Sequence, residues 1–190
     1  MHKVILFRGG MCGDLILPMI NKKYLDYNNS GETFIPGYKL LSERLKMKTF
    51  VNYSQKEKQK YFNKFQNIYN EYTLSHDTDF CLQIPNNVIQ IVCSDYKKIK
   101  LFAKRFAKIE KEAIHKIFDS ATTNEKKFVQ KYYTSLLLWQ DSFTFPNQLD
   151  IKKIGTDSFV DDVVQKFEIK DISWTVKIYN EWLKYNKEFT

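Results

Sequence analysis

The stretch KVILFRGGMCGD, residues 3–14, decides the fold prediction. Its apolar run at residues 4–7 is continuous, which is typical of a parallel strand buried on both faces. The run leads directly into three glycines. Leu15 then begins a helix in which we expect Pro18 to lie in the first turn, where its missing N–H costs little. The stretch therefore predicts a strand, a glycine-rich loop and a helix, in that order.

A second strand and helix follow the same order. The segment VIQIVC, residues 88–93, is almost wholly apolar and rich in β-branched residues, which again indicates a central parallel strand. Ser94 or Asp95 can cap the helix that follows. That helix is expected over residues 96–117, with these side chains on its inner face: Ile99, Phe102, Ala103, Phe106, Ile109, Ala113 and Ile117.

Helical patterns account for most of the remaining chain. A capping box at Ser54 and Glu57 precedes an amphipathic helix that has Tyr72 among its apolar residues. A second capping box, at Thr122 and Glu125, precedes another amphipathic helix. The sequence FTFP, residues 143–146, is expected to end the second of these helices. Further expectations are a short segment ending at His76, a turn at residues 85–87, an extended piece at residues 149–154, and helices over residues 159–167 and 174–183.

Few strands, each buried and followed by a helix, predict an α/β fold: a three-layer, P-loop-like arrangement with a small parallel sheet and abundant helices. We expect one domain over residues 1–190, with a helical C-terminal part from about residue 120 onward. In such sheets ligands bind at the carboxyl ends of the strands. The loop at residues 8–14 and the Ser94–Asp95 turn are both expected at that edge.

The chain is basic, with a formal net charge of +8. An excess of cations favours an anionic partner, which could be nucleic acid, a phosphorylated cofactor or an acidic surface. Lysines at 97, 100, 104, 108 and 111 lie along one side of the expected helix at residues 96–117, with Arg105 close by. Such a stripe can follow a nucleic-acid backbone, but it is equally the solvated face of an amphipathic helix, which we favour.

Cysteine usage and hydropathy indicate a soluble, cytoplasmic protein. Cys12, Cys81 and Cys93 lie far apart without a CxxC pair, and no histidine stands at metal-ligand spacing, so we expect free thiols and no metal. No apolar run is long enough to span a bilayer, so we expect no membrane partner.

The glycine loop has the residue types that an anion site needs. Gly9, Gly10 and Gly13 permit a tight turn whose backbone N–H groups approach a phosphate closely, and Arg8 would add a forked cation. The alternative is that the glycines only make a sharp turn and that Asp14 only caps the helix. Neither GxxxxGK[ST] nor GxGxxG is present, which disfavours a kinase, an ATPase or a dinucleotide site.

The order of strand, RGGMC loop, helix, LSHD segment, IQIVCSD strand and helix resembles the P-loop sulfotransferases over residues 3–105. The resemblance implies the donor 3′-phosphoadenosine 5′-phosphosulfate, a nucleotide-type anionic ligand. Its phosphosulfate would lie on the loop, and its 3′-phosphate near Ser94. Met11 and Cys12 replace the hydroxyl residues of the family, and the arginine before Asp95 is missing. The residues implied to bind the donor are Arg8, Gly9, Gly10, Met11, Cys12, Gly13, Ser94 and, as a substitute, Arg105 or the lysines at 97 and 98.

The resemblance also implies a reaction. A sulfuryl group would pass in line to a hydroxyl or amine of a small-molecule or glycan acceptor, with His76 taking the acceptor proton. The alternative for His76 is a surface or core histidine beside Asp77. The alternative for the whole chain is a non-catalytic binding or accessory protein that retains the fold. The high content of Asn, Lys and Ile would suit a phage or other virus with an AT-rich genome.

Overall fold

Four short parallel strands form the centre of the protein. The computed structural model describes residues 3–21, 72–76, 78–113 and 125–189. The strands are β1 (Lys3–Leu6), β2 (Tyr72–Ser75), β3 (Val88–Val92) and β4 (Gln148–Asp150), in the spatial order β2-β1-β3-β4. Their pairings are all parallel, and β1 aligns Ile5 with Leu74 on one side and Ile89 on the other. The α/β class with a small parallel sheet is therefore confirmed.

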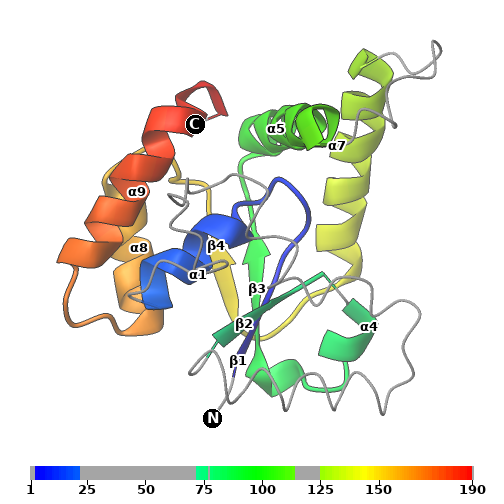
Figure 1. Ribbon diagram of the computed structural model, residues 1–190. Coiled ribbons are helices and arrows are strands. Elements are labelled where there is room, and N and C mark those ends of the chain that lie inside the picture. The colour runs from blue at the N-terminus through cyan, green and yellow to red at the C-terminus, as the bar shows by residue number, and fades with distance from the viewer. Residues whose placement is uncertain (1–2, 22–71, 77, 114–124, 190) are drawn as a thin grey trace.

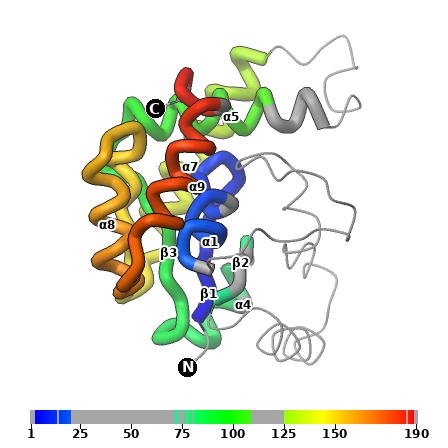
Figure 2. The backbone as a smooth tube through the Cα atoms, turned by 60° about the vertical axis from the view of Figure 1, so that its left-hand side comes forward, coloured from blue at the N-terminus to red at the C-terminus, as the bar shows by residue number. Residues whose placement is uncertain are grey.

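Helices cover the sheet on both faces and at its carboxyl edge (Figures 1 and 2). On one face lie α1 (Gly13–Asn21), α8 (Ser158–Phe167) and α9 (Ser173–Asn186). On the other lie the short α4 (Thr78–Cys81) and the long α7 (Glu125–Ser142). The helix α5 (Tyr96–Ala113) crosses above the carboxyl ends of the strands. Two 3₁₀ turns, η2 (Pro85–Asn87) and η3 (Lys187–Phe189), complete the described elements.

Both inner strands are enclosed as their apolar composition predicts. Val4, Ile5 and Leu6 of β1 have no exposed surface, and in β3 Ile91 has none and Ile89 has 1%. Burial at this level stabilises each side chain by about 1.5–3 kcal/mol relative to exposure. A single polar residue, Gln90, lies in the middle of β3. Its Nε2 donates to the Phe143 carbonyl at 2.7 Å, and its Oε1 accepts the N–H of Phe145 at 3.2 Å. The FTFP segment thus ends α7 and is held against β3.

The start of α1 differs from the sequence prediction. The helix begins at Gly13, so Pro18 lies in its interior and not in the first turn. The cause is the loop before it, where Cys12 at a φ of 59° already turns the chain. The carbonyl of Cys12 accepts the N–H groups of Leu15 and Ile16 at 3.0 and 3.1 Å. Asp14 is therefore the second residue of the helix and not its cap.

Other predictions are adjusted in the same way. Tyr72 begins β2 and is not on a helix, and its ring meets Phe167 edge-on at 5.3 Å. The extended piece expected at residues 149–154 corresponds to the shorter β4, which is displaced toward the N-terminus and supplies an edge strand to the sheet. The helices at residues 159–167 and 174–183 are confirmed as α8 and α9. The helix after Ser54, the cap at Thr122 and residues 114–117 lie outside the described residues.

Candidate functional site

The carboxyl edge of the sheet brings most of the predicted site residues together. Because all four strands are parallel, the loop after β1, His76 after β2 and Ser94 after β3 emerge at the same edge. The strand β1 is an inner strand with β2 on one side and β3 on the other. The predicted location of the glycine loop is therefore confirmed. The packing and hydrogen bonds of the loop show how its backbone groups are used.

The three loop glycines are required by packing. A Cβ atom on Gly9 would collide with the Phe106 ring, and one on Gly13 would collide with the Phe7 ring. A Cβ on Gly10 would lie 2.5 Å from the Phe102 carbonyl oxygen, and its φ of +79° also favours glycine. The loop is thus pressed against α5 by close approach of its backbone.

The carbonyl groups of the loop are held by protein donors. The N–H of Met11 donates to the Arg8 carbonyl at 3.0 Å, and the Tyr132 hydroxyl donates to the Gly9 carbonyl at 3.0 Å. The side chains of Met11 and Cys12 have no exposed surface, and the Cys12 thiol donates to the Gly10 carbonyl at 3.6 Å. These contacts direct the Met11 amide to its own chain, so this amide does not take part in the predicted phosphate cradle.

Arg105 lies behind the loop. Its exposed fraction is 1%, its Nη1 donates to the Gly10 carbonyl at 3.2 Å, and its Nε donates to Asn186 Oδ1 at 2.8 Å. The guanidinium also lies over the Trp182 ring, 5.4 Å from the ring centroid. Arg105 therefore joins the loop to the end of α9. It does not lie with the exposed lysines of α5, and a ligand phosphate would have to displace these partners to reach it.

Arg8 has a different environment. Its side chain is half-buried, and its guanidinium lies 5.5 Å from the centroid of the Trp139 ring. Trp139 is fixed in turn because its Nε1 donates to Thr78 Oγ1 at 3.1 Å. The Nε atom of Arg8 is buried, and the described part of the chain offers it no hydrogen-bond partner. An unpaired buried donor costs about 1–3 kcal/mol, so it needs an explanation.

His76 lies beside the start of the loop. Its Nδ1 is 2.6 Å from the Phe7 carbonyl oxygen, and its ring centroid is 4.1 Å from that of Phe7. A carbonyl can only accept, so Nδ1 carries the hydrogen and Nε2 is the basic nitrogen of the neutral ring. We define Arg8, Trp139 and Thr78, which are joined by the contacts above, as the Arg8 cluster, and His76 lies next to it against Phe7, the residue before Arg8. Asp77, the partner of the alternative interpretation, lies outside the described residues.

Ser94 and Asp95 are engaged with other parts of the protein. The N–H and hydroxyl of Ser94 donate to the two carboxylate oxygens of Asp150 at 3.1 and 2.5 Å. Asp95 Oδ1 accepts the N–H groups of Lys97 at 2.9 Å and Lys98 at 3.4 Å, which confirms it as the cap of α5. A carboxylate already occupies the polar groups of Ser94, and its negative charge disfavours a phosphate at that position.

Cys93 is a buried free thiol next to this turn, as predicted. Burial, with smaller contributions from Asp150 and Asp95, raises the pKa of Cys93 to about 12. Gln140 fixes the backbone here by accepting the Cys93 N–H at 2.6 Å and donating to its carbonyl at 3.3 Å. The sulfur stays protonated at neutral pH and does not act as a nucleophile.

Sequence reasoning missed Thr78 and the role of Trp139. Trp139 faces inward from α7, where its exposed fraction is 3%. Nothing in the periodicity of α7 indicates that the ring lies under Arg8, because that contact depends on how α7 packs against the sheet. Thr78 belongs to α4, a single helical turn whose pattern is too short to identify.

The comparisons with known proteins give no family for this chain. No protein-family model, no curated protein and no solved structure matches it. Within the described ranges, no three His, Cys, Asp or Glu residues gather in a way that would hold a metal ion. Among the helices of those same ranges, none has the length and apolar character that crossing a membrane requires. The class of the protein is therefore given by the fold alone, a parallel α/β protein, with the Arg8 cluster at the carboxyl edge of its sheet.

Proposed function

We propose that this protein binds a nucleotide-type anionic ligand at the Arg8 cluster. The observation that carries the proposal is the buried Nε of Arg8, which has no hydrogen-bond partner. A phosphate or sulfate oxygen would accept from it in a charge-assisted hydrogen bond, and such bonds are about twice as strong as neutral ones. The carboxyl edge of a parallel sheet is also where ligands of α/β proteins bind.

The surroundings of Arg8 suit an anion. The Trp139 ring covers one face of the guanidinium, which leaves the N–H groups at its edge for a forked contact with two oxygens. Trp182 Nε1 is also buried without a partner, but its side chain has no exposed surface and a ligand cannot reach it. Arg8 as a residue is partly exposed, which distinguishes it from Trp182, and a ligand that binds its buried Nε has to displace the groups packed over that atom.

Sulfuryl transfer from 3′-phosphoadenosine 5′-phosphosulfate is the second candidate, and the orientation of His76 favours it. With Nδ1 held by the Phe7 carbonyl, Nε2 is the nitrogen that would take the proton of an acceptor hydroxyl or amine. The acceptor oxygen or nitrogen would bond to sulfur as the bond from sulfur to the donor phosphate breaks. Arg8 would stabilise the charge left on that phosphate. Arg8 fits such a donor, whereas the Ser94 turn, with Asp150 on it, does not fit its 3′-phosphate.

Thermal unfolding with added ligand tests the binding proposal. We expect adenosine 3′,5′-bisphosphate, ADP or pyrophosphate to raise the Tm, because a ligand at 100 times its Kd stabilises the folded state by about 2.7 kcal/mol. Arg8→Met keeps the apolar stem on Trp139 and should abolish the shift, while Arg8→Lys should retain part of it. A Tm that stays constant at millimolar concentrations of all three ligands contradicts the proposal.

The variant His76→Asn separates binding from transfer. An Asn side-chain amide can still donate to the Phe7 carbonyl but has no basic nitrogen at the position of Nε2. We expect this variant to keep the ligand-induced Tm shift. If the protein is a transferase, the variant should lose transfer of labelled sulfate from 3′-phosphoadenosine 5′-phosphosulfate to an acceptor mixture. If the unmodified protein binds the ligand but transfers no sulfate, the ligand-binding function stands and sulfuryl transfer is excluded.

A further inference from the structure

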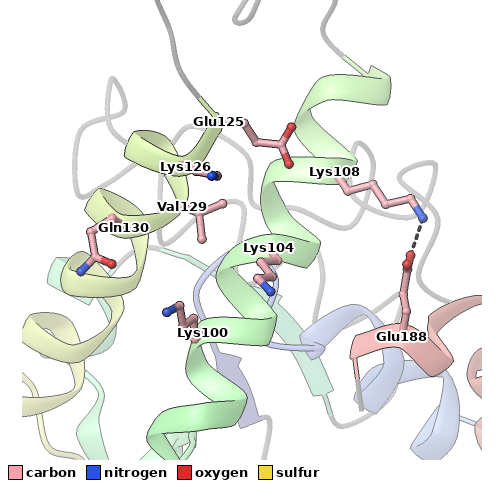
Figure 3. A pocket seen from close by; sticks show the side chains of 8 residues that line it. All are labelled: Lys100, Lys104, Lys108, Glu125, Lys126, Val129, Gln130 and Glu188. Carbon is pink, nitrogen blue, oxygen red and sulfur yellow. Dashed lines mark hydrogen bonds and ion pairs between the residues drawn. The ribbon is translucent and has the colours of Figure 1, made fainter.

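A groove lies between α5 and α7, away from the Arg8 cluster (Figure 3). Its volume is about 600 Å³. Four lysines line it together with two glutamates, one valine and one glutamine. We call it the lysine groove, and its residues are Lys100, Lys104, Lys108, Lys126, Glu125, Glu188, Val129 and Gln130. Arg8, His76 and the glycine loop are not among them.

The described lining of the lysine groove has more lysine side chains than glutamate side chains, and one of the glutamates, Glu188, is in an exposed ion pair that a ligand can replace. Lys108 forms an ion pair with Glu188, whose side chains are 50% and 57% exposed. Exposed ion pairs contribute about 0–1 kcal/mol, so an incoming phosphate can replace Glu188 at low cost. Among the described residues, Lys100 and Lys104 have no carboxylate within ion-pair distance. In Figure 3 both project from α5 beside α7.

The lysines form a line. Lys100, Lys104 and Lys108 follow each other at four-residue intervals on α5, and at 1.5 Å per residue the three span about 12 Å of the helix axis. Lys126 stands opposite them on α7. The two helices are held together by the stacked rings of Phe106 and Tyr132, 4.3 Å between centroids. A rigid linear array of point charges matches an extended polyanion better than a single phosphate.

The lining favours a nucleic-acid backbone over an acidic polypeptide. Among the described residues that line the groove, Val129 is the one apolar side chain and is 8% exposed, so the apolar surface of the groove comes mainly from the stems of its long polar side chains and not from a pocket for the buried anchor residues on which protein interfaces depend. Contacts to phosphate groups need only cationic side chains, and these contacts supply most of the affinity when a protein binds nucleic acid without regard to sequence. Among its described lining residues, the groove has no aromatic side chain that would stack on bases.

We infer that the lysine groove binds the phosphodiester backbone of nucleic acid without regard to base sequence. This inference does not rest on the proposed ligand at Arg8, because the two sites share no residue. The sequence pattern favours a solvated face for the lysine stripe on this helix. The inference assigns a binding role to three of those lysines, Lys100, Lys104 and Lys108.

Fluorescence anisotropy with labelled 20-nucleotide strands of mixed sequence tests the inference, with single-stranded and duplex forms as separate arms. We expect binding at 50 mM salt whose affinity falls as salt rises. The double variant Lys100→Glu, Lys104→Glu should bind about tenfold more weakly, and its salt slope should be smaller by about 1.4 on single strands. Replacing Glu188 by Gln should tighten binding, because it removes the carboxylate that competes for Lys108.

The double variant Lys170→Glu, Lys177→Glu is the matched control, because it changes the net charge by the same amount as the double groove variant. Both residues are exposed, Lys170 in the turn between α8 and α9 and Lys177 on α9, and neither of them lines the groove. Binding weakened as much by Lys170→Glu, Lys177→Glu together as by the double groove variant would show that only net charge matters, and would overturn the inference. So would the absence of binding in both arms, or binding of polyglutamate but not of nucleic acid. Thermal unfolding of each variant confirms that it is folded.

Discussion

The two turns that follow the inner strands differ in how their polar groups are used. After β3, Ser94 is bound by Asp150 and Asp95 caps α5, so the polar side chains of that turn have protein partners. After β1, the loop carbonyls are held by Tyr132 and Arg105, but the neighbouring Arg8 keeps a buried Nε without a partner.

Under the proposed function, this difference indicates at which of the two turns the anionic ligand would bind. A turn whose polar groups are all engaged, with a carboxylate on its outer side, offers nothing to an anion. A cation at the same sheet edge with an unpaired donor offers a charge-assisted hydrogen bond. The sequence resemblance places donor contacts on both turns, whereas the geometry favours only the Arg8 side.

The largest expected effect separates the two arginines at the first turn. Arg105→Met removes the guanidinium donors of the Gly10 carbonyl and of Asn186 Oδ1 in a buried region and leaves the carbonyl only the weak Cys12 thiol donor, so we expect the free energy of unfolding to fall by about 4 kcal/mol. Arg8→Met breaks no hydrogen bond and should cost less than about 1 kcal/mol. Urea unfolding measures both. Equal losses would mean that Arg8 is a structural residue like Arg105.

The second prediction tests the close approach of the loop to α5. Gly10→Ala combines an unfavourable φ with a Cβ only 2.5 Å from the Phe102 carbonyl oxygen, so we expect a loss of about 3 kcal/mol. Gly155→Ala is the matched control, because Gly155 also has a positive φ, 96°, but lies on the surface. It should cost about 1 kcal/mol, from backbone strain alone. A Gly10→Ala protein as stable as the control would refute the packing role of the loop.

The third prediction concerns Cys93 beside the second turn. Its pKa is raised from 9.0 to about 12, so above pH 9 the unfolded thiol loses its proton while the folded one keeps it. Stability therefore falls as the pH rises, and at pH 10.5 the loss from this group is about 2 kcal/mol. Tyr179, whose burial raises its pKa to about 12, acts in the same direction.

Cys93→Ala should flatten the alkaline fall between pH 9 and 11, whatever its effect on stability at neutral pH. Urea unfolding of both proteins over this range measures the two slopes. Parallel pH profiles would show that the Cys93 thiol ionises equally well in the folded state, in conflict with its buried environment.

The smallest expected effect is at the cap of the second turn. Asp95→Ala removes the acceptor of the Lys97 and Lys98 N–H groups and should lower the free energy of unfolding by about 1 kcal/mol. Asp95→Asn keeps a capping oxygen and should lower the free energy of unfolding by only a few tenths of a kcal/mol. Neither change should alter ligand binding at Arg8. A loss of ligand binding in Asp95→Asn would show that the second turn does take part in the site.

The sheet and its helices were largely predictable because their signals are local. Residues 4–7 and 88–93 are continuous apolar runs, and the observed β1 and β3 lie within one residue of those bounds. The positions of α8 and α9 follow from apolar periodicity. Pro18 was misplaced because the start of α1 depends on the backbone conformation of Cys12, which residue type does not reveal.

The site was less predictable because it depends on packing between distant segments. Arg105 falls at the boundary between the apolar and basic faces of α5, so helical periodicity of about 100° per residue leaves its direction open. Its burial follows from Trp182 and Asn186, which lie about eighty residues further along the chain. The contact of Arg8 with Trp139 likewise joins segments whose proximity no local pattern shows.

The side-chain NMR signal of Arg8 tests the central claim most directly. The ¹H–¹⁵N resonance of its Nε–H group can be identified by its absence in Arg8→Lys. Titration with adenosine 3′,5′-bisphosphate should move this resonance downfield in a saturable way, because the unpaired Nε–H gains a charged acceptor. A ligand that binds and shifts other resonances but leaves the Arg8 Nε–H signal unchanged would contradict the account.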